Sequence, residues 1–520
     1  MKRRTMIKML CITVLICITA FSLNGCKKDN KNDISKYAND TAEEASLDKF
    51  NNPDTKFAAK IGTICGDTAL KRLPKIEMSY TNTDSDGIQQ LKNGVIDGYV
   101  LDKPVGEYAV VETDGIIMYP DVFENNKNAF ACKKDADGLA LSNQISEYIL
   151  KIKENGKLDE LCNKWFSLDE DTKSVSIPKD SGSGTIDFAV NCTIVPFTYI
   201  KEGKPVGLDI DIMSGFCREY GYGLNIVNID FSGIIAGISS GKYDVGGSCI
   251  TVTEERKESM YFTEPYYDGG IVLILKTEKE NSNQSFISSV KSSFNKTFIR
   301  ESRWKMVIRG MKMTLFISVF SIIFGTILGF IICMLRMTQN RVVNLLTSVF
   351  TRLVQGTPII VLLLILFYIV FAPCGMNGIW VSIITLALNM SVFVSEMMKS
   401  GIESVDKGQN EAALALGYTK SQSFFKIVFP QAVCNFIPVY RGQVITLIQT
   451  SSIVGYIGVE DLTRISDIIR ARTYEAFFPI IATALIYFMI FGVFTAFLIK
   501  IQHLIEPNRK KRKVKGVIMK

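Results

Sequence analysis

The residue types that carry most enzyme chemistry are scarce in this chain, and their placement favours binding over catalysis. The only histidine, His503, lies at the end of the last apolar run, so the preceding half has no imidazole base. No GxxxxGK(S/T) phosphate-binding loop occurs, which excludes ATP hydrolysis through the usual P-loop. Carboxylates remain available as acids or bases, so an enzyme stays as an alternative.

The 12 cysteines do not form a metal or disulfide pattern. Six of them are scattered through the soluble half without any CxxC pair: Cys65, Cys132, Cys162, Cys192, Cys217 and Cys249. We therefore expect small buried thiols and no metal site.

One polar stretch between two apolar segments, Gly408–Ala432, is longer than a turn requires. Its EAALALG sequence predicts a compact helix that ends at Gly417. Thr419 to Gln422 has the pattern of a capping box and predicts the start of a second helix, which we expect Pro430 to end. The alternative is an amphipathic hairpin lying on the membrane surface.

The second half of the chain contains long runs without charge, and these predict five membrane spans of about 20 residues each. The runs are 313–335, 353–395, which is long enough for two spans, and 476–499, with a weaker run at 433–459 that is interrupted by Arg441. A charge within a span faces protein or water, so Arg441 either snorkels to the inner interface or lines a pathway.

Loop charges predict the orientation of the spans. Arg336, Arg341 and Arg352 follow the first span without an acidic residue among them, and the tail 509–515 is basic. The uncharged loop near Pro373 falls on the opposite side. We expect the soluble half to be extracytoplasmic, and the 408–432 loop and the C-terminus to be cytoplasmic.

The first 26 residues have a basic head, an apolar run and small residues before Cys26, which predicts an export signal. The segment 23–26 resembles the lipobox of bacterial lipoproteins, in which this cysteine is acylated. Retention as a plain membrane anchor remains the alternative.

Glu411-Ala412-Ala413, followed by Gly417, Ile427 and Pro430 at intervals of 6, 16 and 19 residues, resembles the EAA motif of ABC-importer permeases. The segments 355–358 and 401–409 resemble the polar-amino-acid branch, although Gln355 stands where arginine is usual. The resemblance covers residues 300–505. It implies that Glu411, Ala412, Ala413 and Gly417 contact a separate ATPase, which would hold ATP and Mg²⁺, and that two permease copies form the pathway. No cofactor is expected on this chain.

The outer half resembles the type II amino-acid-binding proteins, which fold as two α/β lobes. Residues 185–277 resemble lobe one, and residues 57–168 resemble lobe two with the closing helices. Because lobe two comes first here, we expect one circularly permuted domain cut at a hinge crossing. Two degenerate copies in tandem are the alternative.

The binding-protein resemblance implies a site for the two charged ends of an amino acid. Arg256 would bind the α-carboxylate, assisted by Thr251 and the Gly66-Asp67-Thr68 turn, in which the acidic Asp67 departs from the usual hydroxyl residue. Asp102 would bind the α-ammonium. Alternatively, Arg256 forms a surface ion pair and Asp102 only caps a helix.

Three further residues are assigned by the same resemblance to the ligand's side chain. Phe231 would cover the ligand, unless it belongs to the core. Asn191 stands where an aspartate often meets cationic side chains, so a neutral polar or acidic amino acid is favoured over a basic one. Ile194 replaces a frequent aromatic residue and loosens that side of the pocket.

These features predict a multidomain chain: an α/β binding domain followed by an all-α transmembrane permease. The expected order is signal 1–26, tether 27–56, lobe two with closing helices 57–168, linker 169–184, lobe one 185–277, linker 278–309, permease 310–505 and tail 506–520. The expected function is the binding and permease subunit of an ATP-driven amino-acid importer in the bacterial cell membrane. A ligand-gated channel or receptor with the same binding fold is the main alternative.

Overall fold

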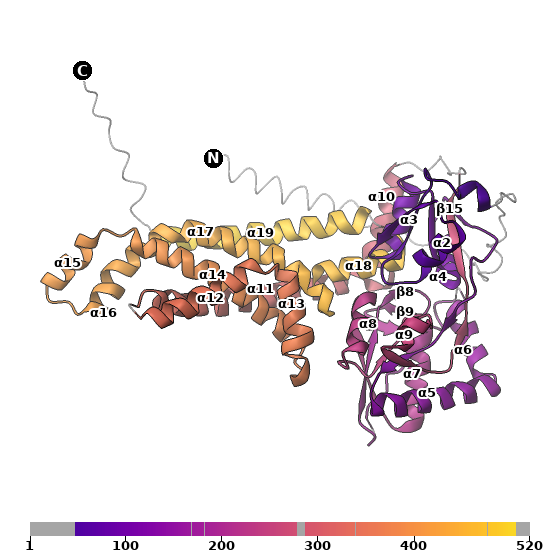
Figure 1. Ribbon diagram of the computed structural model, residues 1–520. Coiled ribbons are helices and arrows are strands. Elements are labelled where there is room, and N and C mark those ends of the chain that lie inside the picture. Colours follow the sequence, from indigo (N-terminus) through magenta and orange to yellow (C-terminus); the bar gives the residue numbers. More distant parts are fainter. Residues whose placement is uncertain are drawn as a thin grey trace.

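The computed structural model describes residues 47–505 except 168, 181, 278–285, 339 and 476. An α/β domain occupies one end of an elongated molecule, and a helical bundle extends from it (Figure 1). The predicted multidomain fold class is therefore confirmed. The expected signal with Cys26 and the basic tail lie outside the described residues.

One lobe of the α/β domain, here lobe two, is built on a five-stranded sheet. Its strands lie in the order β2 (Glu77–Thr81), β1 (Lys56–Lys60), β3 (Gly98–Asp102), β15 (Ile271–Lys276) and β4 (Ile116–Met118). Its helices are α2 (Cys65–Arg72), α3 (Asp84–Lys92) and α4 (Lys103–Glu112), and a short turn, η1 (Leu47–Phe50), precedes β1. The central strands are apolar and buried because helices cover the sheet.

The other lobe, lobe one, is built on a second five-stranded sheet. Its strands lie in the order β11 (Gly223–Asn228), β7 (Thr185–Val190), β12 (Val245–Gly246), β6 (Ala131–Lys133) and β13 (Met260–Phe262). A small sheet adjoins it, formed by β10 (Lys204–Val206), β9 (Thr198–Lys201) and β8 (Thr193–Ile194). Its helices are α5 (Ala136–Glu154), α6 (Lys157–Phe166), α7 (Leu208–Tyr220), α8 (Phe231–Ser239) and α9 (Glu254–Lys257).

The two outer pieces of the sequence exchange strands, so they form one domain rather than two copies. Strand β6 comes from the first piece but lies in the sheet of lobe one, and β15 comes from the second piece but pairs with β3 of lobe two. The chain crosses between the lobes at β5 (Lys127–Asn128) and β14 (Tyr267–Asp268), which pair with each other.

This arrangement corrects two sequence predictions. Residues 185–277 are not all lobe one, because β15 completes the sheet of lobe two. The chain ends of the domain also do not lie at a hinge crossing. They fall inside lobe two, at the start of β1 and the end of β15, because hydrophobic β15 pairs with β3 and β4 of that lobe.

The helical bundle begins after a short pre-membrane segment of α10 (Phe286–Phe294), η2 (Asn295–Ile299) and η3 (Arg300–Ser302). Its main helices are α11 (Trp304–Arg336), α12 (Arg341–Gly356), α13 (Ile359–Ile365) with η4 (Leu366–Val370), α14 (Gly378–Glu403), α17 (Phe429–Thr450), α18 (Leu462–Thr473) and α19 (Phe477–Ile505). Short turns η5 (Ala372–Cys374) and η7 (Ser451–Ile457) join some of them.

Among the described residues, α11, α14 and α19 are each long and apolar enough to cross a membrane. Two bent helix pairs bring the number of candidate spans to five, which is the predicted number. One pair, α12 with α13 and η4, bends by 107° at Gly356-Thr357-Pro358, where proline interrupts the helix. The chain reverses after it at Gly375, which adopts a left-handed φ of 58°, as predicted.

Close helix packing in the bundle depends on two glycines of α11. A Cβ atom at Gly325 would lie 3.0 Å from the carbonyl oxygen of Ala387, and one at Gly329 would lie 2.7 Å from that of Ser391. The absence of side chains at these positions lets α11 and α14 approach each other closely. Elsewhere in the bundle, Arg441 of α17 donates a hydrogen bond to Gln502 of α19, 3.3 Å away.

The loop between α14 and α17 folds as predicted up to its proline. Helix α15 (Lys407–Ala415) ends before Gly417, which has φ of 86°, and α16 (Lys420–Ser423) begins with the capping box of Thr419 and Gln422. The prediction that Pro430 ends the second helix is wrong. A π-helical turn, η6 (Phe424–Val428), precedes the proline and carries the helix on into α17, because the wider turn accommodates a residue without an N–H.

Candidate functional site

A cavity lies between the two lobes and is lined by residues from both. Its charged lining residues are Lys60, Asp84 and Asp102 from lobe two and Arg256 from lobe one. Two cations and two anions in one enclosed space make this cavity the candidate functional site.

Arg256 lies on the single turn α9, which Thr253 caps by accepting a hydrogen bond from the Arg256 N–H. Its guanidinium donates to the carbonyl oxygen of Thr251 in lobe one and to that of Gly62 in lobe two, at 2.8 Å each. It therefore joins the lobes across the cavity and is not a surface ion pair. A guanidinium has five N–H groups, so donors remain for a carboxylate.

Asp102 lies at the end of β3 and precedes α4, but its side chain does not cap that helix. Its carboxylate accepts a hydrogen bond instead from the Asn126 amide, 2.8 Å away, and this amide also donates to the Thr251 hydroxyl. Burial raises the pKa of the Asp102 carboxyl to about 6, against the lowering effect of the Asn126 bond. The group can therefore hold a cation at neutral pH.

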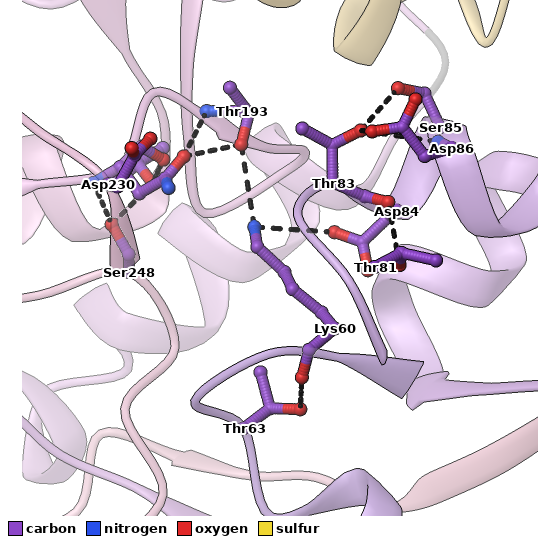
Figure 2. A network of polar contacts seen from close by, with 12 residues as sticks. Lys60, Thr63, Thr81, Thr83, Asp84, Ser85, Asp86, Thr193, Asp230 and Ser248 are labelled. Carbon is purple, nitrogen blue, oxygen red and sulfur yellow. Dashed lines mark hydrogen bonds and ion pairs between the residues drawn. The ribbon is translucent and has the colours of Figure 1, made fainter. Parts of the chain in front are cut away.

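A buried ion pair of lobe two lines the cavity at the end of β1 (Figure 2). The Lys60 ammonium lies 3.6 Å from the Asp84 carboxylate and 3.5 Å from the Thr193 hydroxyl of lobe one. It also lies 5.9 Å from the centre of the Phe231 ring. Because Lys60 is only 3% exposed, its charge requires these partners.

The backbone at Ser248 and Cys249 lines the cavity in a left-handed conformation, with φ of 86° and 59°. Two consecutive residues other than glycine in this region indicate strain that the surroundings hold in place. Both N–H groups donate to Asp209, at 2.6 and 3.2 Å. Burial raises the pKa of the Asp209 carboxyl to about 7. Asp209 thus fixes the shape of this wall.

Not all residues predicted for the site line the cavity. The cavity is lined by five of the predicted residues: Arg256, Thr251, Asp102, Phe231 and Ile194.

Gly66, Asp67 and Thr68 do not line this cavity, and their predicted contact with a ligand stays a prediction. They lie inside α2, where Asp67 is exposed and Thr68 donates to Glu124. The turn at the cavity is one step earlier in the chain, at Thr63-Ile64-Cys65.

Asn191 is placed behind the cavity rather than in it. It is buried, and its side-chain oxygen accepts hydrogen bonds from the N–H and hydroxyl of Thr193. Because Thr193 in turn contacts Lys60, Asn191 positions a cavity residue without lining the space.

Sequence reasoning missed Lys60, Asp84 and Asn126. Lys60 could have been found from a lysine that ends the apolar strand KFAAK, where a solvated charge is unexpected. No comparable signal marks Asp84 and Asn126. Asp84 resembles any acid at a helix start, and the Asn126 contacts join segments 24 and 125 residues apart.

A second candidate site is the loop formed by α15 and α16, which lies at the end of the bundle farthest from the lobes (Figure 1). Glu411 and Ala412 are exposed on α15, whereas Ala413 is buried and packs within the loop. The tip residue Leu416 is 79% exposed. A rigid, capped loop with an exposed apolar tip suits contact with another protein.

Residues 186–417 match the family of bacterial extracellular solute-binding proteins, family 3. The matched segment begins within β7 of lobe one and extends into the bundle.

Three comparisons concern the bundle. A protein named as a glutamine transport system permease in Rickettsia felis is 33% identical over 189 residues, which cover 35% of this chain and 85% of that protein. The arginine transport system permease of Bacillus subtilis is 32% identical over 191 residues, which cover 36% of this chain and 87% of that protein. The crystal structure of an amino acid ABC transporter with histidines aligns at 32% identity and TM-score 0.37, over 43% of this chain and 99% of its own.

The cavity geometry predicts how its thiols react. Cys65 of lobe two and Cys249 of lobe one both line the closed cavity, and burial raises the pKa of both well above that of a free thiol. We expect N-ethylmaleimide to label exposed Cys374 at least about a hundredfold faster than either. Peptide mass spectrometry of quenched time points measures the rates.

Cys217, buried on α7 away from the cavity, is the matched control for unfolding. Labelling of Cys65 and Cys249 at the rate of Cys374, with Cys217 protected, would contradict the closed arrangement.

Proposed function

The chain belongs to the family of polar-amino-acid ABC-importer permeases, and on this premise we propose that it both captures and conducts a neutral polar amino acid. Its bundle is the permease, and its α/β domain is an amino-acid-binding domain. The proposal rests on the charged residues of the cavity. Arg256 and Asp102 match the carboxylate and the ammonium of an amino acid, and Lys60 and Asp84 remain as an ion pair. The family membership favours transport over the gated-channel alternative.

The main-chain charges of the ligand would be bound at opposite walls of the cavity. Arg256 has unused N–H groups beside the cavity and would hold the carboxylate in a bidentate contact. Asp102, with Asn126 at its other side, would hold the ammonium. Both roles were expected from the sequence.

The remaining pair, Lys60 and Asp84, would face the ligand side chain. With the two ends of the ligand neutralised, the pair is balanced, so a charged side chain would bring a like charge beside one of its members. A neutral amide offers a carbonyl to Lys60 and an N–H₂ to Asp84. We therefore propose L-glutamine or a similar neutral polar amino acid, and not a basic one.

Transport would require partners. Since the chain lacks a P-loop, a separate ATPase with bound ATP and Mg²⁺ would dock on the α15–α16 loop, where Glu411 and Ala412 are exposed. Two copies of the permease would enclose the pathway. The loop charges support an orientation with the lobes outside the cell membrane and the α15–α16 loop inside.

The experiment that tests the proposal is calorimetric titration of the full-length protein with L-glutamine, L-asparagine, L-glutamate and L-arginine. We expect a neutral amide to bind most tightly. Arg256→Lys should weaken its binding by roughly 10- to 100-fold, because a bidentate contact to a charged group becomes a single one. Arg218→Lys, at an exposed arginine of lobe one, is the matched control and should bind normally. Tightest binding of L-arginine would refute the neutral class.

Binding should also depend on pH through Asp102. Only the carboxylate attracts an ammonium, and its pKa in the cavity is about 6. Affinity for L-glutamine should therefore be constant above pH 7 and fall as the pH drops through 6, approaching about tenfold per unit.

Asp102→Asn should remove this dependence, whereas Asp137→Asn, at an exposed carboxyl of α5, should retain it. An unchanged affinity between pH 7 and pH 5 in the wild type would remove Asp102 from the site.

The α15–α16 loop should be required for uptake but not for capture. Glu411→Lys reverses an exposed charge, and Gly417→Leu places a side chain where φ is 86°. We expect both variants to abolish uptake of labelled L-glutamine in the source cells while titration gives the wild-type affinity. The matched control is Glu154→Lys, an exposed charge reversal on lobe one. Normal uptake by both loop variants would show that the loop does not couple to an ATPase.

A further inference from the structure

Helix α18 of the permease bundle carries three arginines into the junction with the α/β domain. Arg464, Arg470 and Arg472 are at most 9% exposed. Figure 1 places α18 where the bundle meets α3 and the strands β8 and β9. A helix of the permease thus lies against both lobes of the binding domain.

Arg464 contacts lobe one. Its guanidinium forms an ion pair with Asp230 and donates a second hydrogen bond to the side-chain oxygen of Asn228, 3.4 Å away. Asp230 immediately precedes α8, and the first residue of that helix, Phe231, lines the cavity. The contact therefore lies one residue from the ligand space.

Arg470 contacts lobe two in an equivalent place. It forms an ion pair with Asp86 in the first turn of α3 and a second one with Asp467 of its own helix, 3.0 Å away. The same turn contains Asp84, which lines the cavity and pairs with Lys60, and Figure 2 shows both acids in one polar network. This network also reaches Thr193 of lobe one through the Lys60 ammonium.

Arg472 lies between the lobes. Its guanidinium carbon is 5.4 Å from the ring centre of Tyr108 in lobe two and 4.7 Å from that of Tyr199 in lobe one. It also donates to the Tyr108 hydroxyl and pairs with Glu170 at 2.8 Å and Glu301 at 3.2 Å. One side chain of the permease therefore touches both lobes.

These contacts can all exist together only while the lobes keep their closed arrangement. Arg464 and Arg470 are fixed on one helix, so a rotation of either lobe away from the other must break one of the two ion pairs. We propose that α18 is a closure sensor, which binds both lobes of the closed binding domain and loses part of its contacts when the lobes open.

The position of α18 in the chain connects this sensor to the α15–α16 loop. The helical segment Lys420–Ile457 runs from the α15–α16 loop through α17 and is followed by α18 at an angle of 53°. Closure of the lobes would therefore act on the outer end of the same helical segment whose inner end forms the loop. Because a ligand shifts the equilibrium only through differential affinity, α18 and the ligand must stabilise the same closed form.

The inference rests on the proposed amino-acid ligand, and the test separates the two. The ion pair is reversed with Arg470→Asp, with Asp86→Arg, and with both changes together in the full-length protein. Each single change places like charges together and should weaken L-glutamine binding about tenfold, because the closed fraction falls. Each should also speed maleimide labelling of Cys65 and Cys249 by about the same factor.

The double variant, built on Asp467→Asn because Asp467 also pairs with Arg470 at 3.0 Å, should return both quantities to within about threefold of the Asp467→Asn reference, which a purely structural loss would not do. Arg309→Asp is the matched control, because Arg309 pairs with Glu460 at 3.0 Å and donates only to Gly203 of lobe one. It should leave affinity and labelling unchanged. Asp86→Asn, a milder change, should give a smaller effect of the same sign and serves if a reversed variant does not fold.

Unchanged affinity and labelling in Arg470→Asp or in Asp86→Asn would overturn the closure sensor, and so would a folded double variant that does not recover. If the wild type binds no amino acid, the proposed ligand fails. The labelling rates of Cys65 and Cys249 then still decide whether α18 holds the lobes closed.

Discussion

Burial of charge between the lobes constrains this structure more than any other feature. A charged group removed from water must find an opposite charge or fixed dipoles. Lys60 finds Asp84, and Arg472 finds Glu170 and Glu301. Lys60 also contacts Thr193 and Phe231 of the opposite lobe, and Arg472 of α18 contacts an aromatic ring of each lobe. The closed arrangement is therefore the one in which these buried charges are satisfied, and an opening motion must expose or unpair some of them.

The exchange of strands determines how each lobe is attached to the permease. The chain leaves the α/β domain from β15, so lobe two is connected covalently to the bundle through α10. Lobe one is held by contacts alone. Lys242 donates to the carbonyl oxygen of Phe367, and Gly458 approaches so closely that a Cβ atom there would lie 2.6 Å from the Asn228 carbonyl oxygen. A tethered lobe and a docked lobe can thus respond differently to the same closing motion.

Much of this organisation could be predicted from the sequence, because its signals are local. Charge-free runs indicate the spans, and Thr419 with Gln422 indicates a helix start. Local patterns failed where partners are distant in the chain. The sequence of β15 is that of an ordinary apolar strand, and its pairing with the distant strands β3 and β4 places it in lobe two. Pro430 normally ends a helix, but a preceding π-helical turn accommodates it.

The connection from the cavity to the α15–α16 loop runs through α18 and the helical segment Lys420–Ile457. It is most easily bent where the backbone hydrogen bonds of that segment are incomplete. Between the lobes and α18 the contacts are buried ion pairs, which resist small displacements. Within the helical segment that follows, Pro438 has no N–H to complete the backbone ladder, and η6 is wider than an α-helix. Bending therefore costs least at these two places. Motion of α18 would therefore bend the segment near Pro438 or η6, and the capped α15–α16 loop would tilt as a unit and keep its shape.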